Sequence, residues 1–355
     1  MQHAFYSWFQ LSIGFFGVIA LFLLFFAVIA LIVTRKKKLG KDIKIEVKCL
    51  NKIYEENKNK LLQNILEVDE LKKLTKEETA KLKKEKKGNK ANKNSKNSPD
   101  SIKKRIFVLD FNGDVSASCL PVFREQITAV LQVALQSDEI VLRLESPGGY
   151  VHSYGLAASQ LARIREKQIP FTICVDKVAA SGGYMMACLA DKIIAAPFSI
   201  LGSIGVVANV PNFNRILQKN NVDYLEMTAG EYKRTVTMLG EVTEKGRTKF
   251  QEQLEETHGL FKDHIKKYRP VVDIDSVATG EYWLGTKALE HKLVDELKTS
   301  DDYLVQSSEK SKIYQIYSPK KESLREKLMG TASLFLSTAH HKKMELEKNS
   351  YPLFM

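Results

Sequence analysis

Two short stretches in the middle of the 355-residue chain place a serine and several glycines where hydrolytic chemistry is possible. Ser146-Pro147-Gly148-Gly149 follows the apolar run 140–144, and Ala180-Ser181-Gly182-Gly183-Tyr184 follows the apolar run 171–175. Each stretch reads as a strand that enters a small-residue turn and then a helix. A serine on such a turn is exposed, and neighbouring glycines let a substrate backbone approach and direct free N–H groups at it. Together the two turns predict a nucleophile and an oxyanion hole.

Ser181 is the candidate nucleophile, and a serine hydroxyl needs a base that removes its proton. A histidine with an acidic partner, a metal hydroxide and a neutral lysine are the bases to consider. No cluster of His, Asp or Glu has the spacing of metal ligands, so no metal is expected. No histidine lies in a glycine-bounded loop with an obvious acidic partner. The histidines within residues 105–300 are therefore expected to be ordinary surface residues; they are His152, His258, His264 and His291.

Lys233 is the lysine that the sequence offers as a base. It lies in the turn-like stretch 228–234, after the apolar run 224–227, which reads as a strand. A lysine acts as a base only where burial or nearby positive charge disfavours its ammonium form. Arg234 and the apolar residues around Lys233 could supply such surroundings. On the residues alone, a solvated surface lysine remains the more frequent case, and the identity of the base stays open.

Four motifs occur in order: Ser-Pro-Gly-Gly, Ala-Ser-Gly-Gly-Tyr, Gly-Ser-Ile-Gly at 202–205 and Gly-x-Tyr-Lys at 230–233. Over about residues 105–300 this series resembles the S49 family of signal peptide peptidase A-type serine proteases, in particular its single-domain, membrane-anchored branch. The resemblance implies a crotonase/Clp-like α/β fold and a Ser–Lys dyad. Carried over by motif, Ser181 is the nucleophile, Lys233 is the general base and Ser203 orients the lysine. The oxyanion donors are then the N–H of Gly182 and that of either Gly148 or Gly149.

The resemblance also implies what the protein acts on and how it assembles. It predicts an endopeptidase for unfolded or membrane-released, signal-peptide-like peptides, with a small or apolar residue in the primary pocket and no cofactor. Family members form rings in which the lysine can approach the serine from a neighbouring domain or protomer, so a homo-oligomer is expected, with the dyad in cis or in trans. Two other functions stay open, because a fold does not fix a function: a crotonase-type hydratase or acyl-transfer enzyme, and a catalytically inactive scaffold.

The net charge of +12 is unevenly placed. Residues 35–105 contain 24 Lys or Arg and 11 Asp or Glu, whereas residues 1–34 contain none of these. The remainder is therefore close to neutral, and no nucleic-acid partner is expected. The cysteines have no spacing typical of a zinc site or a disulfide framework; they are Cys49, Cys119, Cys174 and Cys188.

Residues 11–33 are uncharged and almost entirely apolar, long enough to cross a bilayer. Basic residues 35–38 follow, and the features of a cleaved signal peptide are missing, so an uncleaved anchor is expected. The positive-inside rule puts the body of a single-pass protein of the bacterial inner membrane in the cytoplasm, with the periplasmic side as the alternative. A second apolar stretch, 193–210, is interrupted by Pro197 and two glycines, which favours short buried strands over a second span.

From Arg105 on, apolar strands alternate with helices, which predicts an α/β domain with a largely parallel sheet. The expected strands are 106–111, 140–144, 171–175, 192–195 and 204–207, and the expected helices are 123–135, 151–165, 184–190 and 241–268. The expected order of domains is an N-terminal segment (1–10), the transmembrane anchor (11–34), a basic linker that is partly helical and partly disordered (35–104), the peptidase domain (105–300) and a C-terminal extension (301–355).

Overall fold

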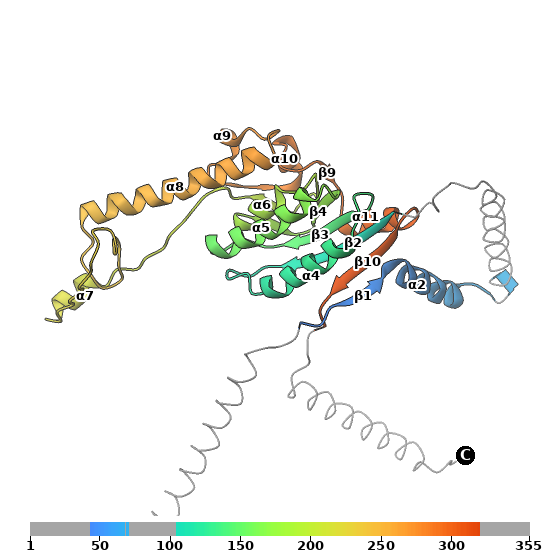
Figure 1. The fold of residues 1–355 in the computed structure, drawn as a ribbon, viewed down its shortest axis with the longest axis horizontal. Helices are drawn as coiled ribbons and strands as arrows, with labels where there is room; N and C mark the ends of the chain where they lie inside the picture. Colours follow the sequence, from blue (N-terminus) through green and yellow to red (C-terminus); the bar gives the residue numbers. More distant parts are fainter. Residues whose placement is uncertain (1–42, 68, 71–103, 320–355) are drawn as a thin grey trace, which may run out of the picture. The chain divides into compact units, whose positions relative to one another are not determined.

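A computed structural model describes residues 43–67, 69–70 and 104–319 (Figure 1). The expected anchor (11–34), much of the linker and the chain after residue 319 lie outside these ranges. Within them, no helix combines the length and the apolar character that a membrane crossing requires. The helices and strands described below belong to the unit that begins at Ile45.

The apolar runs of the sequence form the strands of one seven-stranded sheet. In spatial order its strands are β1 (Glu46–Cys49), β10 (Lys312–Tyr317), β2 (Arg105–Asn112), β3 (Glu139–Glu145), β4 (Phe171–Val175), β6 (Lys192–Ala195) and β9 (Glu296–Leu297). All neighbours pair in parallel except β1, which runs antiparallel to β10. The central strands are buried on both faces, as expected for parallel strands between helices. The prediction of a largely parallel α/β fold is confirmed.

Helices cover the two faces of this sheet. Alternate side chains of a strand point to opposite faces, and the two sets of buried side chains pack on different helices. One face is covered by α4 (Leu120–Val133), α5 (Val151–Glu166) and α6 (Gly182–Ala187). The other is covered by α2 (Leu50–Ile65) and α11 (Ser300–Ser308). The helices predicted at 123–135, 151–165 and 184–190 correspond to α4, α5 and α6.

A second, three-stranded sheet supports the turn that carries Ser181. It has the order β5 (Val178–Ala180), β7 (Ile200–Gly202) and β8 (Tyr282–Leu284). The parallel bridge between Ser146 and Ala179 connects β5 to the end of β3. The strand predicted at 204–207 is wrong, because Gly202 and Ser203 adopt φ of +87° and +49° and end β7 before that segment begins. The apolar stretch 193–210 does contain two short strands, β6 and β7, as predicted.

Residues 206–243, here called the arm, connect β7 to the long helix α8 (Glu244–Tyr268) and include the short helix α7 (Asn214–Lys219). Figure 1 shows the arm at the end of α8 that lies away from the large sheet. Its turns are tied to one another, since the amide of Asn212 donates to the carbonyls of Thr237 and Gly240, both at 2.9 Å. The strand predicted at 224–227 is wrong, because these residues have no paired neighbour among the described strands.

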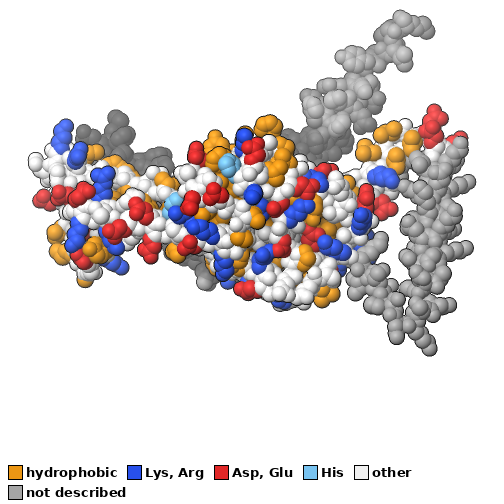
Figure 2. All heavy atoms as spheres, turned by 90° about the horizontal axis from the view of Figure 1, so that it is seen from above, with side chains coloured by type: hydrophobic (Ala, Val, Ile, Leu, Met, Phe, Trp, Pro, Cys, Tyr) orange, Lys and Arg blue, Asp and Glu red, His pale blue; other side chains and the backbone are white. Residues whose placement is uncertain are grey.

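Apolar side chains of the arm face solvent in the single chain. Val207, Leu225 and Met227 are about four-fifths exposed, at 80%, 77% and 83%. Figure 2 shows hydrophobic side chains among the charged ones at this end of the molecule. α8 ends at Tyr268, as predicted for the helix 241–268, and begins at Glu244. The short helices α9 (Ile274–Val277) and α10 (Gly285–Glu290) follow it and precede β9.

Candidate active site

Ser181 lies on the turn between β5 and α6, in a conformation that few non-glycine residues adopt. Its backbone angles are φ +52° and ψ −119°. Such a conformation costs on the order of 1–3 kcal/mol and persists only where surrounding contacts hold it. The N–H of Ser181 donates to the Gly202 carbonyl at 2.8 Å, and its own carbonyl accepts from the N–H of Met185 at 3.0 Å. A strained strand-to-helix turn of this kind presents the serine hydroxyl at the surface of a site.

The two glycine turns predicted from the sequence are in contact. Gly148 has φ +89°, and a Cβ on it would lie 2.7 Å from the nitrogen of Gly182 and 2.8 Å from the Cβ of Ser181. A Cβ on Gly149 would lie only 2.0 Å from the carbonyl oxygen of Val115. A side chain at Gly148 would therefore push the two glycine turns apart, and one at Gly149 would clash with the backbone of Val115.

The structure distinguishes between the two glycines of the first turn. The N–H of Gly148 donates to Ser146 Oγ at 3.1 Å and is occupied. The N–H of Gly149 has no hydrogen-bond partner within the described part of the chain. Gly182 is the first residue of α6, where a backbone N–H has no acceptor inside its helix. The free donors beside Ser181 are thus those of Gly149 and Gly182.

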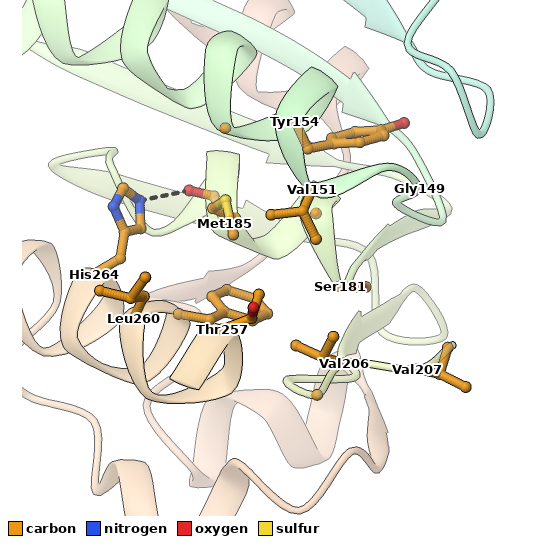
Figure 3. Close-up of a pocket in the computed structure, with 14 residues that line it drawn as sticks. Gly149, Val151, Tyr154, Ser181, Met185, Val206, Val207, Thr257, Leu260 and His264 are labelled. Atoms are coloured by element: carbon orange, nitrogen blue, oxygen red, sulfur yellow. Dashed lines mark hydrogen bonds between the residues drawn. The ribbon is translucent and has the colours of Figure 1, made fainter. Parts of the chain in front are cut away.

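An apolar cavity of about 290 Å³ opens next to Ser181. Figure 3 shows Val151 and Met185 on one side, facing Leu260 of α8 across the cavity. This volume lies at the small end of the range for ligand pockets, and the lining is mostly apolar. The arrangement suits one side chain of a peptide whose backbone passes Ser181.

His264 of α8 lines this cavity and is held as a neutral imidazole. Its Nε2–H donates to the Met185 carbonyl at 3.0 Å (Figure 3), which leaves the proton on Nε2. Burial lowers the pKa of His264, Lys267 lowers it further, and the bond to Met185 opposes both. The cavity is therefore uncharged at neutral pH.

Acidification is expected to weaken the binding of apolar peptides, because it charges His264 inside the cavity. The pKa of His264 lies below its ordinary value of 6.5, so the ring becomes charged only below that pH. Between about pH 7.5 and about pH 5 the Kd should rise roughly three- to tenfold, as polar desolvation costs at least about 1 kcal/mol. Folding stability falls in the same window, because the unfolded chain binds the proton first.

This effect can be measured by fluorescence anisotropy of a labelled apolar peptide on the Ser181→Ala variant, in which cleavage does not interfere. His264→Gln is the matched control, since its amide still donates to the Met185 carbonyl but does not titrate. An equal rise of Kd in both proteins would show that His264 is not the group responsible.

The four histidines within residues 105–300 have partners other than Ser181. His258 Nε2 lies 3.2 Å from the Ile204 carbonyl, and His264 is bonded to Met185. The ring of His152 stacks on Tyr150, and that of His291 lies against Trp283. Within the described residues, none of the four has a hydrogen bond to Ser181.

Ser203 lies beside Ser181, directly after Gly202, whose carbonyl accepts the Ser181 N–H. Its N–H donates to the Glu281 carbonyl at 2.7 Å, and its Oγ lies 3.5 Å from the Gly280 carbonyl. The weak bond at Oγ leaves this hydroxyl available to another partner. Within the single chain, that partner is not Lys233.

Lys233 is exposed in the arm, and the structure does not bring it to Ser181 within one chain. Its neighbours hold the arm against the first turns of α8: Lys245 forms an ion pair with Glu231, and Lys245 and Lys249 lie over the ring of Tyr232. The cavity wall is formed by later residues of the same helix. At about 1.5 Å per residue, α8 spans about 18 Å between Lys245 and Thr257, the first of these wall residues.

Three groups of the site were not predicted from the sequence. The cavity wall on α8 consists of Thr257, Leu260, Phe261 and His264. Their spacing of three and four residues is the helical signal that could have indicated one inward face of the helix 241–268. Tyr154 and the hydroxyl of Ser146 lie behind the glycine turns, and no short-range pattern marks their contact.

Comparison with known proteins gives consistent matches over nearly the whole chain. Residues 163–314 match Peptidase family S49, and residues 8–161 match Peptidase family S49 N-terminal. Over 312 residues the chain is 50% identical to Probable protease SohB of Haemophilus influenzae, covering 87% of this chain and 88% of that protein. Over 301 residues it is 48% identical to Probable protease SohB of Buchnera aphidicola subsp. Schlechtendalia chinensis, covering 83% of this chain and 97% of that protein.

Solved structures include a mutant of the 1510-N membrane-bound stomatin-specific protease in complex with a substrate peptide. It has 15% sequence identity and a TM-score of 0.39, and the alignment covers 65% of this chain and 98% of that one.

Proposed function

Because this chain belongs to peptidase family S49 and is a serine protease, we propose that it cleaves peptide bonds with a dyad of Ser181 and Lys233. The observation that carries this proposal is the strained turn at Ser181, which lies next to two free N–H donors and opens on an apolar cavity. The fold expected with such a site is the crotonase/Clp-like form of the α/β class.

In the proposed reaction, neutral Lys233 takes the proton of Ser181 while Oγ attacks the scissile carbonyl. The oxyanion that forms accepts hydrogen bonds from the N–H groups of Gly149 and Gly182, and each such donor contributes about 2.7–4 kcal/mol. The lysine then passes its proton to the leaving amine, and a water activated by the same lysine hydrolyses the acyl-enzyme. Ser203 Oγ accepts a hydrogen bond from the lysine and orients it.

Lys233 reaches the serine of a neighbouring copy in this proposal. Two observations support a dyad in trans. The part of the arm next to Lys233 is held at the start of α8, about 18 Å along the helix from the cavity wall, and apolar side chains of the arm are exposed. Leu260 and Val207, which line the cavity, are themselves 66% and 80% exposed. The arm of a second copy that covers them would bury apolar surface and deliver the base in one step. The working form is thus a homo-oligomer.

The proposed substrates are unfolded or membrane-released peptides with an apolar residue at the cleavage site. The cavity beside Ser181 is lined by apolar side chains such as Val151, Met185 and Leu260. An extended peptide can lie along the segment that ends β3 and bind as an added strand. The apolar stretch 11–34 and the basic residues 35–38 support a single-pass anchor in the bacterial inner membrane, in contact with lipid, with the site on the cytoplasmic side.

An active-site label tests the proposal directly. We expect a serine-directed fluorophosphonate to label the purified full-length chain at Ser181, and a peptide aldehyde to block the labelling. Ser159→Ala, which alters an exposed serine of α5, is the matched control and should label like the wild type. Absence of label on assembled wild-type protein would favour a scaffold or a hydratase instead.

A further inference from the structure

A chain of buried hydrogen bonds lies directly behind the two glycine turns. The N–H of Gly148 donates to Ser146 Oγ at 3.1 Å, Ser146 Oγ lies 2.5 Å from Tyr154 Oη, and Tyr154 Oη donates to the Asp114 carbonyl at 2.7 Å. Ser146 and Tyr154 are fully buried. Each group of this chain has a partner, as buried polar groups require.

The two ends of the chain fix the direction of every bond in it. A peptide N–H such as that of Gly148 only donates, and a carbonyl such as that of Asp114 only accepts. Tyr154 has a single hydroxyl proton, which goes to Asp114. The hydroxyl of Ser146 must therefore donate to Tyr154, so rotating any one hydroxyl would leave a buried group unpaired.

The ring of Tyr154 forms the other half of the same support. A Cβ on Gly182 would lie 2.5 Å from Tyr154 Cγ and 2.7 Å from its Cβ, so the backbone of Gly182 rests on this side chain. One residue of α5 thus contacts the second glycine turn through its ring and the first through its hydroxyl. Tyr154 thus connects two turns that are more than thirty residues apart in the sequence.

The turn that accepts the Tyr154 hydroxyl is itself firmly held. Hydrogen bonds from Ser118 and Ser116 lower the pKa of the Asp114 carboxyl to about 2, so this carboxylate stays charged at any ordinary assay pH. The carbonyl of the next residue, Val115, accepts a hydrogen bond from the N–H of Tyr150 at 2.9 Å. The 113–118 turn therefore supports the first glycine turn from outside while Tyr154 supports it from within.

From this geometry we infer that Tyr154 is a positioning residue for the oxyanion hole. It sets the distance and angle between the N–H groups of Gly149 and Gly182, because its hydroxyl fixes one turn and its ring fixes the other. Occupation of the Gly148 N–H by Ser146 also leaves Gly149 as the donor that faces the substrate. The inference rests on the proposed function, since the hole acts only where an oxyanion forms.

The test uses the full-length chain, three single variants and the double variant Tyr154→Phe/Ser146→Ala. Tyr154→Phe keeps the ring and removes Oη, and Ser146→Ala removes the acceptor of the Gly148 N–H. Tyr184→Phe is the matched control: Tyr184 is also fully buried, and its hydroxyl donates to the Leu293 carbonyl at 2.9 Å. The measurements are kcat and KM for an apolar peptide, the Ki of a peptide aldehyde, whose adduct mimics the oxyanion, and the Tm.

Tyr154→Phe should lower kcat and raise the aldehyde Ki by a similar factor, roughly ten- to a hundredfold, with KM nearly unchanged. This is less than the roughly 10²- to 10³-fold loss on deleting an oxyanion donor outright. Ser146→Ala should give a similar loss, and the double variant little more, because both act through one chain of bonds. Tyr184→Phe should lower the Tm and leave kcat and Ki unchanged.

Two outcomes overturn the inference. One is a Tyr154→Phe protein whose Tm is lowered while its kcat and Ki are unchanged. If that variant does not fold, unchanged kcat and Ki in Ser146→Ala overturn the inference instead. The other is a loss of kcat in the Tyr184→Phe control of the same size, which would indicate a general effect of stability. Failure of the proposed function is seen separately, as peptide cleavage that survives in Ser181→Ala.

Discussion

Ser181→Ala lowers kcat for peptide hydrolysis by roughly 10⁴- to 10⁶-fold, the loss known for serine proteases without their nucleophile. The acyl-enzyme cannot form without Oγ, and the oxyanion hole alone accelerates hydrolysis only weakly. The fold should survive, because alanine keeps the Cβ and the backbone bonds of the turn to Gly202 and Met185. Release of a fluorophore from an apolar peptide measures the loss.

Ser159→Ala is the control for handling and assembly, and it should retain wild-type kcat. Cleavage that continues in Ser181→Ala at more than about a hundredth of the wild-type rate would rule out Ser181 as the nucleophile. Turnover of an acyl thioester by that variant would instead favour the crotonase-type alternative.

Lys233→Ala should abolish cleavage to a similar extent, because Ser181 then lacks the base of the proposed dyad. Lys233→Arg should be equally inactive, since the guanidinium keeps the charge but does not release its proton. Lys219→Ala, which alters another exposed lysine of the arm, is the control and should stay active. Initial rates on the same fluorogenic peptide compare the four proteins.

Mixing the inactive Ser181→Ala and Lys233→Ala chains distinguishes a dyad in trans from one in cis. In a mixed oligomer, a serine from one chain meets a lysine from the other, and random assembly gives about a quarter of the wild-type activity through a head-to-tail interface. No recovery after dissociation and reassembly would mean that each chain uses its own lysine. The arm would then have to leave α8 and fold back toward the cavity.

The sequence predicted the centre of the fold better than its edges. β4 and β6 have the bounds that their apolar runs indicated, because a buried parallel strand is apolar along its whole length. The three-residue strands β5, β7 and β8 exist only through pairing across the small sheet, and such pairing leaves no periodic signal. The edge strand β1 pairs with β10, which lies more than 250 residues away in the sequence. Close to this pair, Asn51 Oδ1 accepts a hydrogen bond from the N–H of Ile313 at 2.8 Å.

The same division applies to the site. The small-residue turns around Gly148 and Ser181 are local features, so their position between an apolar run and a helix was predictable, and the two turns are in contact. The choice between Gly148 and Gly149 depends on the hydroxyl of Ser146, which a motif does not reveal. The distance between Lys233 and Ser181 depends on how the arm packs on α8, and in the proposed function on a second copy of the chain.

If Lys233 acts in trans, as proposed, a single chain is inactive. It carries Ser181 and the free N–H groups of Gly149 and Gly182, but it has no base within reach until a second copy binds. The proposed activity would then rise more steeply than in proportion to the concentration of the chain. Dilution would inactivate such an enzyme without an inhibitor, and assembly would activate it without a processing step.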